Sequence, residues 1–72
     1  MVTIRVQDYN NLDKVKMMRW LSERWVGVDE YAFVMDGLET LPSGDLQFYP
    51  ACAFEDSVAP VVLTEFTLKW GV

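Results

Sequence analysis

The sequence predicts an α+β domain in which one amphipathic helix packs on one face of a mainly antiparallel sheet. Two observations support this fold class. Residues 11–25 repeat apolar side chains at helical intervals, and the segments on either side are apolar and β-branched, separated by turn residues. We expect the order β-α-β-β-β, with four strands, or five if every turn signal is real. Residues 1–72 then form a single domain.

The predicted helix has apolar residues at positions 12, 15, 18, 21 and 25, as a 3.6-residue period requires. Asn10 or Asn11 can cap its first turn, and Gly27 is a candidate C-terminal stop. The stripe predicted to face the core consists of Val15, Met17, Met18, Leu21 and Trp25.

Trp20 is the large aromatic residue on the opposite face of this helix. Lys16 precedes it by four residues and Arg24 follows it by four, so both stems can touch the indole. We favour the interpretation that these stems or a strand edge cover the ring. The alternative is an exposed anchor for a partner, because Trp and Arg are enriched in interface hot spots.

The strands are predicted from alternation. Residues 1–7 alternate with one face toward the core, and residues 8–10 connect them to the helix. Residues 31–35 form a second strand, after which two turn signals compete. The pair at 36–37 is either a hairpin turn, leaving a short strand at 38–41, or a bulge in one strand ending near Leu41. We favour the bulge, and expect a turn at 42–45.

Residues 46–49 form the next strand, and residues 51–54 can continue it if Pro50 lies at an edge or bulge. The segment 61–70 shows the clearest alternation. It is predicted to be an interior strand, and one face would carry Val62, Thr64, Phe66, Leu68 and Trp70.

Composition excludes several chemistries. The chain has no histidine and a single cysteine, Cys52, so one chain offers neither a structural zinc site nor a histidine-based nucleophile. Its four glycines are scattered, and no phosphate-binding loop is present. We therefore expect no enzymatic activity and no cofactor. The lone cysteine, the lack of a signal-peptide pattern and the lack of an apolar run of about 20 residues favour the cytoplasm, including that of a host cell, over a membrane.

Charge is unevenly distributed along the chain. Eleven acids face six bases, four of the bases lie in the helix, and the span 25–68 contains eight acids without Lys or Arg. In a meander that uses both turns, Asp36, Glu39, Glu55 and Asp56 would gather at one end of the sheet, and Asp29, Glu30 and Asp45 at the other. Such acids either keep a small apolar protein soluble or attract a basic surface.

Two functional hypotheses follow. The first is a non-enzymatic protein that binds and blocks a basic, nucleic-acid-handling protein without binding nucleic acid itself. Small phage-encoded inhibitors of host defence, including anti-CRISPR proteins, share this profile as an analogy of class. The second is a structural or assembly subunit that forms a homodimer or larger homo-oligomer, because aromatics are abundant and sheet edges can be open. The candidate partner-binding residues are Asp36, Glu39, Glu55, Asp56, Trp20 and Tyr49.

Overall fold

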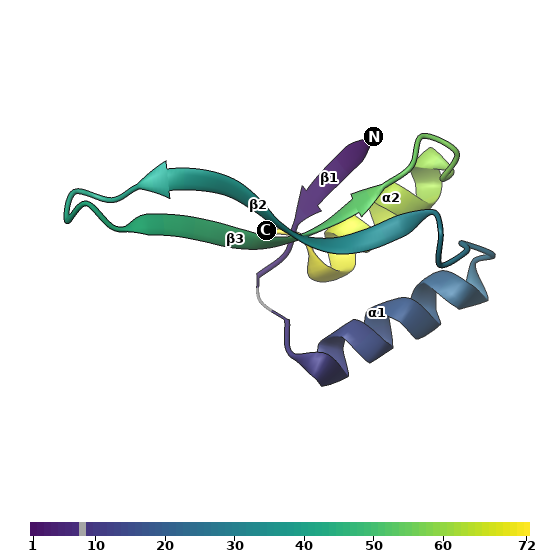
Figure 1. Ribbon diagram of the computed structural model, residues 1–72. Helices are drawn as coiled ribbons and strands as arrows, with labels where there is room; N and C mark the ends of the chain where they lie inside the picture. The colour runs from purple at the N-terminus through teal and green to yellow at the C-terminus, as the bar shows by residue number, and fades with distance from the viewer. Residues whose placement is uncertain (8) are drawn as a thin grey trace.

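The computed structural model describes residues 1–7 and 9–72, with the backbone alone at residue 38, so Asp8 of the predicted connection lies outside the described residues. The elements are β1 (Val2–Arg5), α1 (Asn11–Glu23), β2 (Tyr31–Thr40), β3 (Leu46–Phe54) and α2 (Pro60–Trp70). The strands form an antiparallel sheet with β3 between β1 and β2 (Figure 1). The predicted α+β class, with an amphipathic helix on one face of an antiparallel sheet, is confirmed.

The predicted last strand is wrong, because residues 60–70 form the helix α2. The order is therefore β-α-β-β-α, and an isolated antiparallel bridge between Val6 and Gly71 lies beyond β1. Pro60 occupies the start of the helix, where a missing N–H costs nothing. The hydroxyls of Thr64 and Thr67 donate to the carbonyls four residues earlier, at 3.1 and 2.8 Å, which accommodates β-branched residues in a helix.

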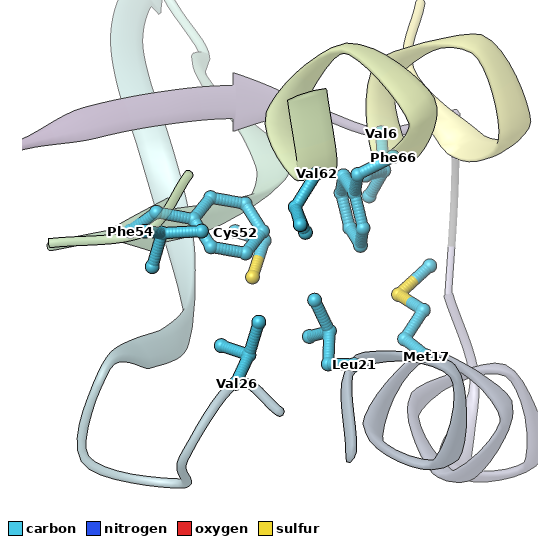
Figure 2. Close-up of a cluster of buried hydrophobic side chains, with 9 residues drawn as sticks. Val6, Met17, Leu21, Val26, Cys52, Phe54, Val62 and Phe66 are labelled. Carbon is cyan, nitrogen blue, oxygen red and sulfur yellow. The ribbon is translucent and has the colours of Figure 1, made fainter. Parts of the chain in front are cut away.

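Both helices pack on the same face of the sheet. Cys52 and Phe54 of β3 point toward Met17 and Leu21 of α1, and Phe66 of α2 closes the cluster (Figure 2). Phe66 is fully buried, and its ring lies 5.0 Å from Phe54, 6.1 Å from Trp20 and 5.1 Å from Trp70, between ring centres. One aromatic side chain thus joins the two helices to the central strand.

The C-terminal end of α1 differs from its prediction. Of the two candidate caps, Asn10 caps the helix, since its side-chain oxygen accepts the Asp13 N–H at 3.0 Å. The helix then ends at Glu23, four residues before the predicted stop at Gly27. Trp25 takes the left-handed conformation, with φ 64°, and the N–H of Val26 bonds the Leu21 carbonyl at 3.0 Å. This is a Schellman motif, and Val26 and Leu21 make its apolar contact in the core.

The predicted apolar stripe of α1 is therefore correct at two of its five positions. Met17 and Leu21 are buried, whereas Val15 and Met18 are exposed and Trp25 is 93% exposed. Trp25 follows the helix, so the helical period no longer governs its direction. The covered flank instead includes Trp20, because α2 packs there.

The bulge interpretation of residues 36–37 is confirmed. β2 runs unbroken to Thr40, and its register against β3 shifts between Asp36 and Glu39. Gly37 has φ 70°, a conformation that glycine tolerates without strain. β3 also continues through Pro50, whose carbonyl accepts the Val6 N–H at 3.0 Å where β1 ends. No helix in the described part of the chain is long and apolar enough to cross a membrane.

Replacing Phe66 with alanine should unfold much of the population. Truncating a buried Phe costs about 3–5 kcal/mol, whereas a 72-residue domain has about 4–10 kcal/mol of total stability. The control is Leu68→Ala on the same helix, at a side chain that is 83% exposed. Urea denaturation followed by circular dichroism should show a large loss for Phe66→Ala and a change within about 0.5 kcal/mol for the control. Equal losses would contradict the central position of Phe66.

Cys52 should resist alkylation in the folded protein. Its side chain is fully buried, and burial raises the pKa of the thiol to about 12. Because the thiolate is the reactive form, iodoacetamide at pH 8 should label the native protein very slowly and the urea-unfolded protein at the rate of a free thiol. Mass spectrometry over time measures both rates, and fast labelling of the native protein would contradict this environment.

Candidate functional site: an acidic hairpin arm

The β2–β3 hairpin extends beyond the helices that cover its base. β2 has 10 residues and spans about 33 Å, whereas the 13 residues of α1 span about 20 Å. The far half of the hairpin consequently projects alone from the body (Figure 1), and the longest dimension of the molecule is 43 Å. We call residues 35–50 the arm.

A tight turn closes the tip of the arm where the sequence predicts one. The Leu41 N–H donates to the Asp45 carbonyl at 2.7 Å, and the Gly44 N–H donates to the Leu41 carbonyl at 2.8 Å. Gly44 has φ 91°, and the Ser43 hydroxyl donates to the Asp45 carboxylate at 3.1 Å. These bonds fix the pairing of the two strands up to the tip.

The two faces of the arm differ in chemistry. Side chains alternate between faces along a strand, so Leu46, Phe48 and Pro50 share the face of Cys52. Met35 pairs with Pro50 and joins them. Met35, Leu46 and Phe48 are 59%, 57% and 51% exposed, because the helices end before reaching them. The arm therefore presents an apolar face that this chain leaves uncovered.

The opposite face of the arm carries a polar cluster at its base. Asp36 pairs with Tyr49 and Glu39 with Gln47 across the strands. The Arg5 Nε donates to the Asp36 carboxylate at 2.9 Å, and the guanidinium carbon lies 4.4 Å from the centre of the Tyr49 ring. The Tyr49 hydroxyl donates to the Glu39 carboxylate at 2.8 Å. The arm carries three acids, Asp36, Glu39 and Asp45, and Arg5 pairs with one of them, Asp36, which leaves the arm acidic.

This cluster changes the proton affinity of two of its members. The hydrogen bond to Asp36 raises the pKa of Arg5, because the carboxylate favours the charged guanidinium. The hydrogen bond to Glu39 raises the pKa of Tyr49, since losing the phenol proton would place two negative oxygens in contact.

The structure brings together three of the six candidate partner-binding residues: Asp36, Glu39 and Tyr49. The predicted grouping of Asp36 and Glu39 with Glu55 and Asp56 is wrong. Residues 36–37 bulge instead of turning, so Glu55 and Asp56 lie at the opposite end of β3, beside the start of β2.

Two of the acids at this other end, Asp56 and Glu30, are engaged within the chain. The Met1 amino group lies 2.6 Å from the Asp56 carboxylate. Glu30 accepts the Gly27 N–H at 3.0 Å and the Ser57 hydroxyl at 2.9 Å, and these bonds lower its pKa.

Trp20 is covered, as the favoured interpretation holds. The Arg24 guanidinium carbon lies 3.7 Å from the centre of a Trp20 ring, and Trp70 meets the indole edge-on at 5.4 Å. Arg24 also donates to Glu65 at 3.1 Å, which ties α1 to α2. Trp20 is thus part of the packing between the helices and has no place on the arm.

Sequence reasoning missed Phe48, Met35 and Leu46 as exposed residues. Their alternation with polar neighbours predicts a core-facing side of a strand, and they do share the core face. The available signal was length, because a helix of 13 residues cannot cover a 10-residue strand.

Among the described residues, no group of three or more Cys, Asp or Glu side chains is placed to hold a metal ion. No protein-family model, curated protein or solved structure matches this chain. The arguments for function therefore come from its own geometry.

Replacing Glu39 with glutamine should lower the pKa of Tyr49 toward 10, because the acceptor loses its charge. The raised pKa means that this bond contributes fully to stability below pH 10, and the contribution is lost as pH rises through the folded-state value. NMR titration of the tyrosine ring carbons measures the shift. Asp45→Asn is the matched control, since Asp45 does not contact Tyr49, and an equal shift there would contradict the assignment.

Proposed function

We propose that this protein is a non-enzymatic binding protein whose arm occupies a basic surface on a protein that handles nucleic acid, and so blocks or modulates it. The observation that carries the proposal is the arm itself, which projects beyond the core with one apolar face and one acidic face. Protein–protein interfaces typically have an apolar core surrounded by a polar rim, and the arm has both kinds of residue side by side.

The choice of a basic partner follows from the charge of the arm. Of Asp36, Glu39 and Asp45, Asp36 pairs with Arg5, and residues 35–50 themselves contain no Lys or Arg. A groove lined with Lys and Arg to bind phosphate attracts such carboxylates by the same electrostatics. Phe48 would supply the apolar anchor, with Met35 and Leu46 beside it. Small phage-encoded inhibitors, anti-CRISPR proteins among them, are the class with which this profile agrees.

The free edge of β2 offers a further mode of contact. β2 pairs with β3 along one side, and no described strand pairs with its other side. A partner strand can add to such an edge through main-chain hydrogen bonds. This would fix the arm in a defined register while its two faces provide specificity.

The test is affinity capture from a lysate of the native host, using the immobilised protein at low and high salt. Glu39→Gln with Asp45→Asn removes two arm charges and leaves the Arg5–Asp36 pair intact. The matched control, Glu23→Gln with Glu55→Gln, removes two exposed charges away from the arm. We expect the wild type and the control to retain a basic protein that high salt releases, and the arm variant to lose it.

Phe48→Ser should also abolish capture without changing the charge. If the arm variants retain the partner, or the two-charge control loses it equally, the proposed use of the arm is wrong. A retained partner should release bound DNA or RNA when the protein is added, and failure to do so would contradict a blocking role.

A second candidate function, a small structural or assembly subunit acting as a homo-oligomer, is favoured by apolar side chains exposed away from the arm. Val15, Met18 and Val28 lie uncovered along α1 and the loop that follows it.

A further inference from the structure

Trp25 is the most exposed large apolar side chain in the described part of the chain, at 93%. It is also the one described non-glycine residue with a positive φ, 64°. A helix ending of this kind favours glycine, because a side chain in the left-handed conformation is strained. Trp25 therefore contributes almost no burial and occupies a strained position, so folding does not account for a tryptophan here.

An apolar groove lies beside Trp25. It has a volume of about 470 Å³ and is lined chiefly by Val15 and Met18 of α1, Val28 of the following loop and Tyr31 of β2. Ser22 and Val26, which flank Trp25 in the sequence, also line it. Trp25 itself is not part of the wall, so its exposed indole leaves the groove unfilled.

We propose that a second copy of this chain binds here, with Trp25 of each copy inserted into the groove of the other. A two-fold interface requires one surface that is complementary to itself, and a projecting side chain beside a matching groove meets that requirement. The pairing would bury both indoles, which otherwise remain in water.

The charged residues at the rim of the groove also favour a second copy of this chain as the partner. Arg19 lines the groove, and Asp29 follows Val28 at its margin. Neither forms an ion pair within the described part of the chain, although other carboxylates and bases there do. In a two-fold pair, Arg19 of one copy and Asp29 of the other are complementary across the rim.

This interface lies at the start of β2, whereas the arm is formed by its far end (Figure 1). A dimer built here leaves both arms free, and it does not depend on the partner proposed for the arm.

Analytical ultracentrifugation of the purified chain over a dilution series tests the inference. We expect a dimer that dissociates on dilution. Trp25→Gly should weaken it about a thousand-fold, because two hot-spot side chains are lost. The urea midpoint of the Trp25→Gly monomer should equal or exceed that of the wild-type monomer, since glycine suits the left-handed position. This separates loss of association from loss of folding.

Met18→Lys should also give a monomer, because it places a charge in the groove. Leu68→Lys is the control, at an exposed α2 residue outside the groove, and should leave the dimer intact. Mixing the Trp25→Gly and Met18→Lys variants should restore a weak heterodimer, since one intact indole then meets one intact groove. A wild-type monomer at the highest soluble concentration would overturn the inference. So would a dimer that survives Trp25→Gly, or the absence of the heterodimer.

Discussion

The packing of Phe66 against Phe54, Trp20 and Trp70 is the contact on which the rest of the structure depends. A chain of 72 residues has apolar volume for one small core, and this ring joins all three of its parts: the central strand, α1 and α2. The side chains that pack around this ring form the core. The arm and the C-terminal end of α1 both lie beyond it, and both expose large apolar side chains.

The arm is a consequence of two different rises per residue. A strand advances about 3.3 Å per residue and a helix about 1.5 Å, so helices of 13 and 11 residues cover only about half of the hairpin. The alternation of β3 continues unchanged past the end of the helices. Phe48 and Leu46 therefore point to the same side of the sheet as the core residues, but no helix covers them there. The bulge at Gly37 adds the polar side, because it brings Glu39 to Tyr49 while Arg5 holds Asp36.

Local signals in the sequence were sufficient for the Asn10 cap, the turn at 42–45, the bulge and the order of the first four elements. They were insufficient for α2, because Val62, Phe66 and Trp70 recur every four residues. A period of four satisfies both the alternation of a strand and, closely, the turn of a helix. Thr64 and Leu68 distinguish the two, since a strand would direct them to the core and the helix leaves them in solvent. Only the tertiary contact with α1 decides this, although Pro60 at the first helical position was a local indication.

Trp25 shows why the candidate surfaces were harder to predict than the fold. Its position fits the helical period of the buried stripe, but the Schellman bonds of Trp25 and Val26 end the helix first and direct the indole outward. The left-handed backbone and the lack of burial both disfavour tryptophan at position 25. A residue that does not suit its local structure is expected where it serves something other than folding. Phe48 differs in this respect, because its backbone is unstrained and it is exposed for the sole reason that the helices end before reaching it. The strain at Trp25 therefore makes it the stronger indication of an intermolecular contact, and the groove beside it accounts for both its side chain and the exposed half of α1.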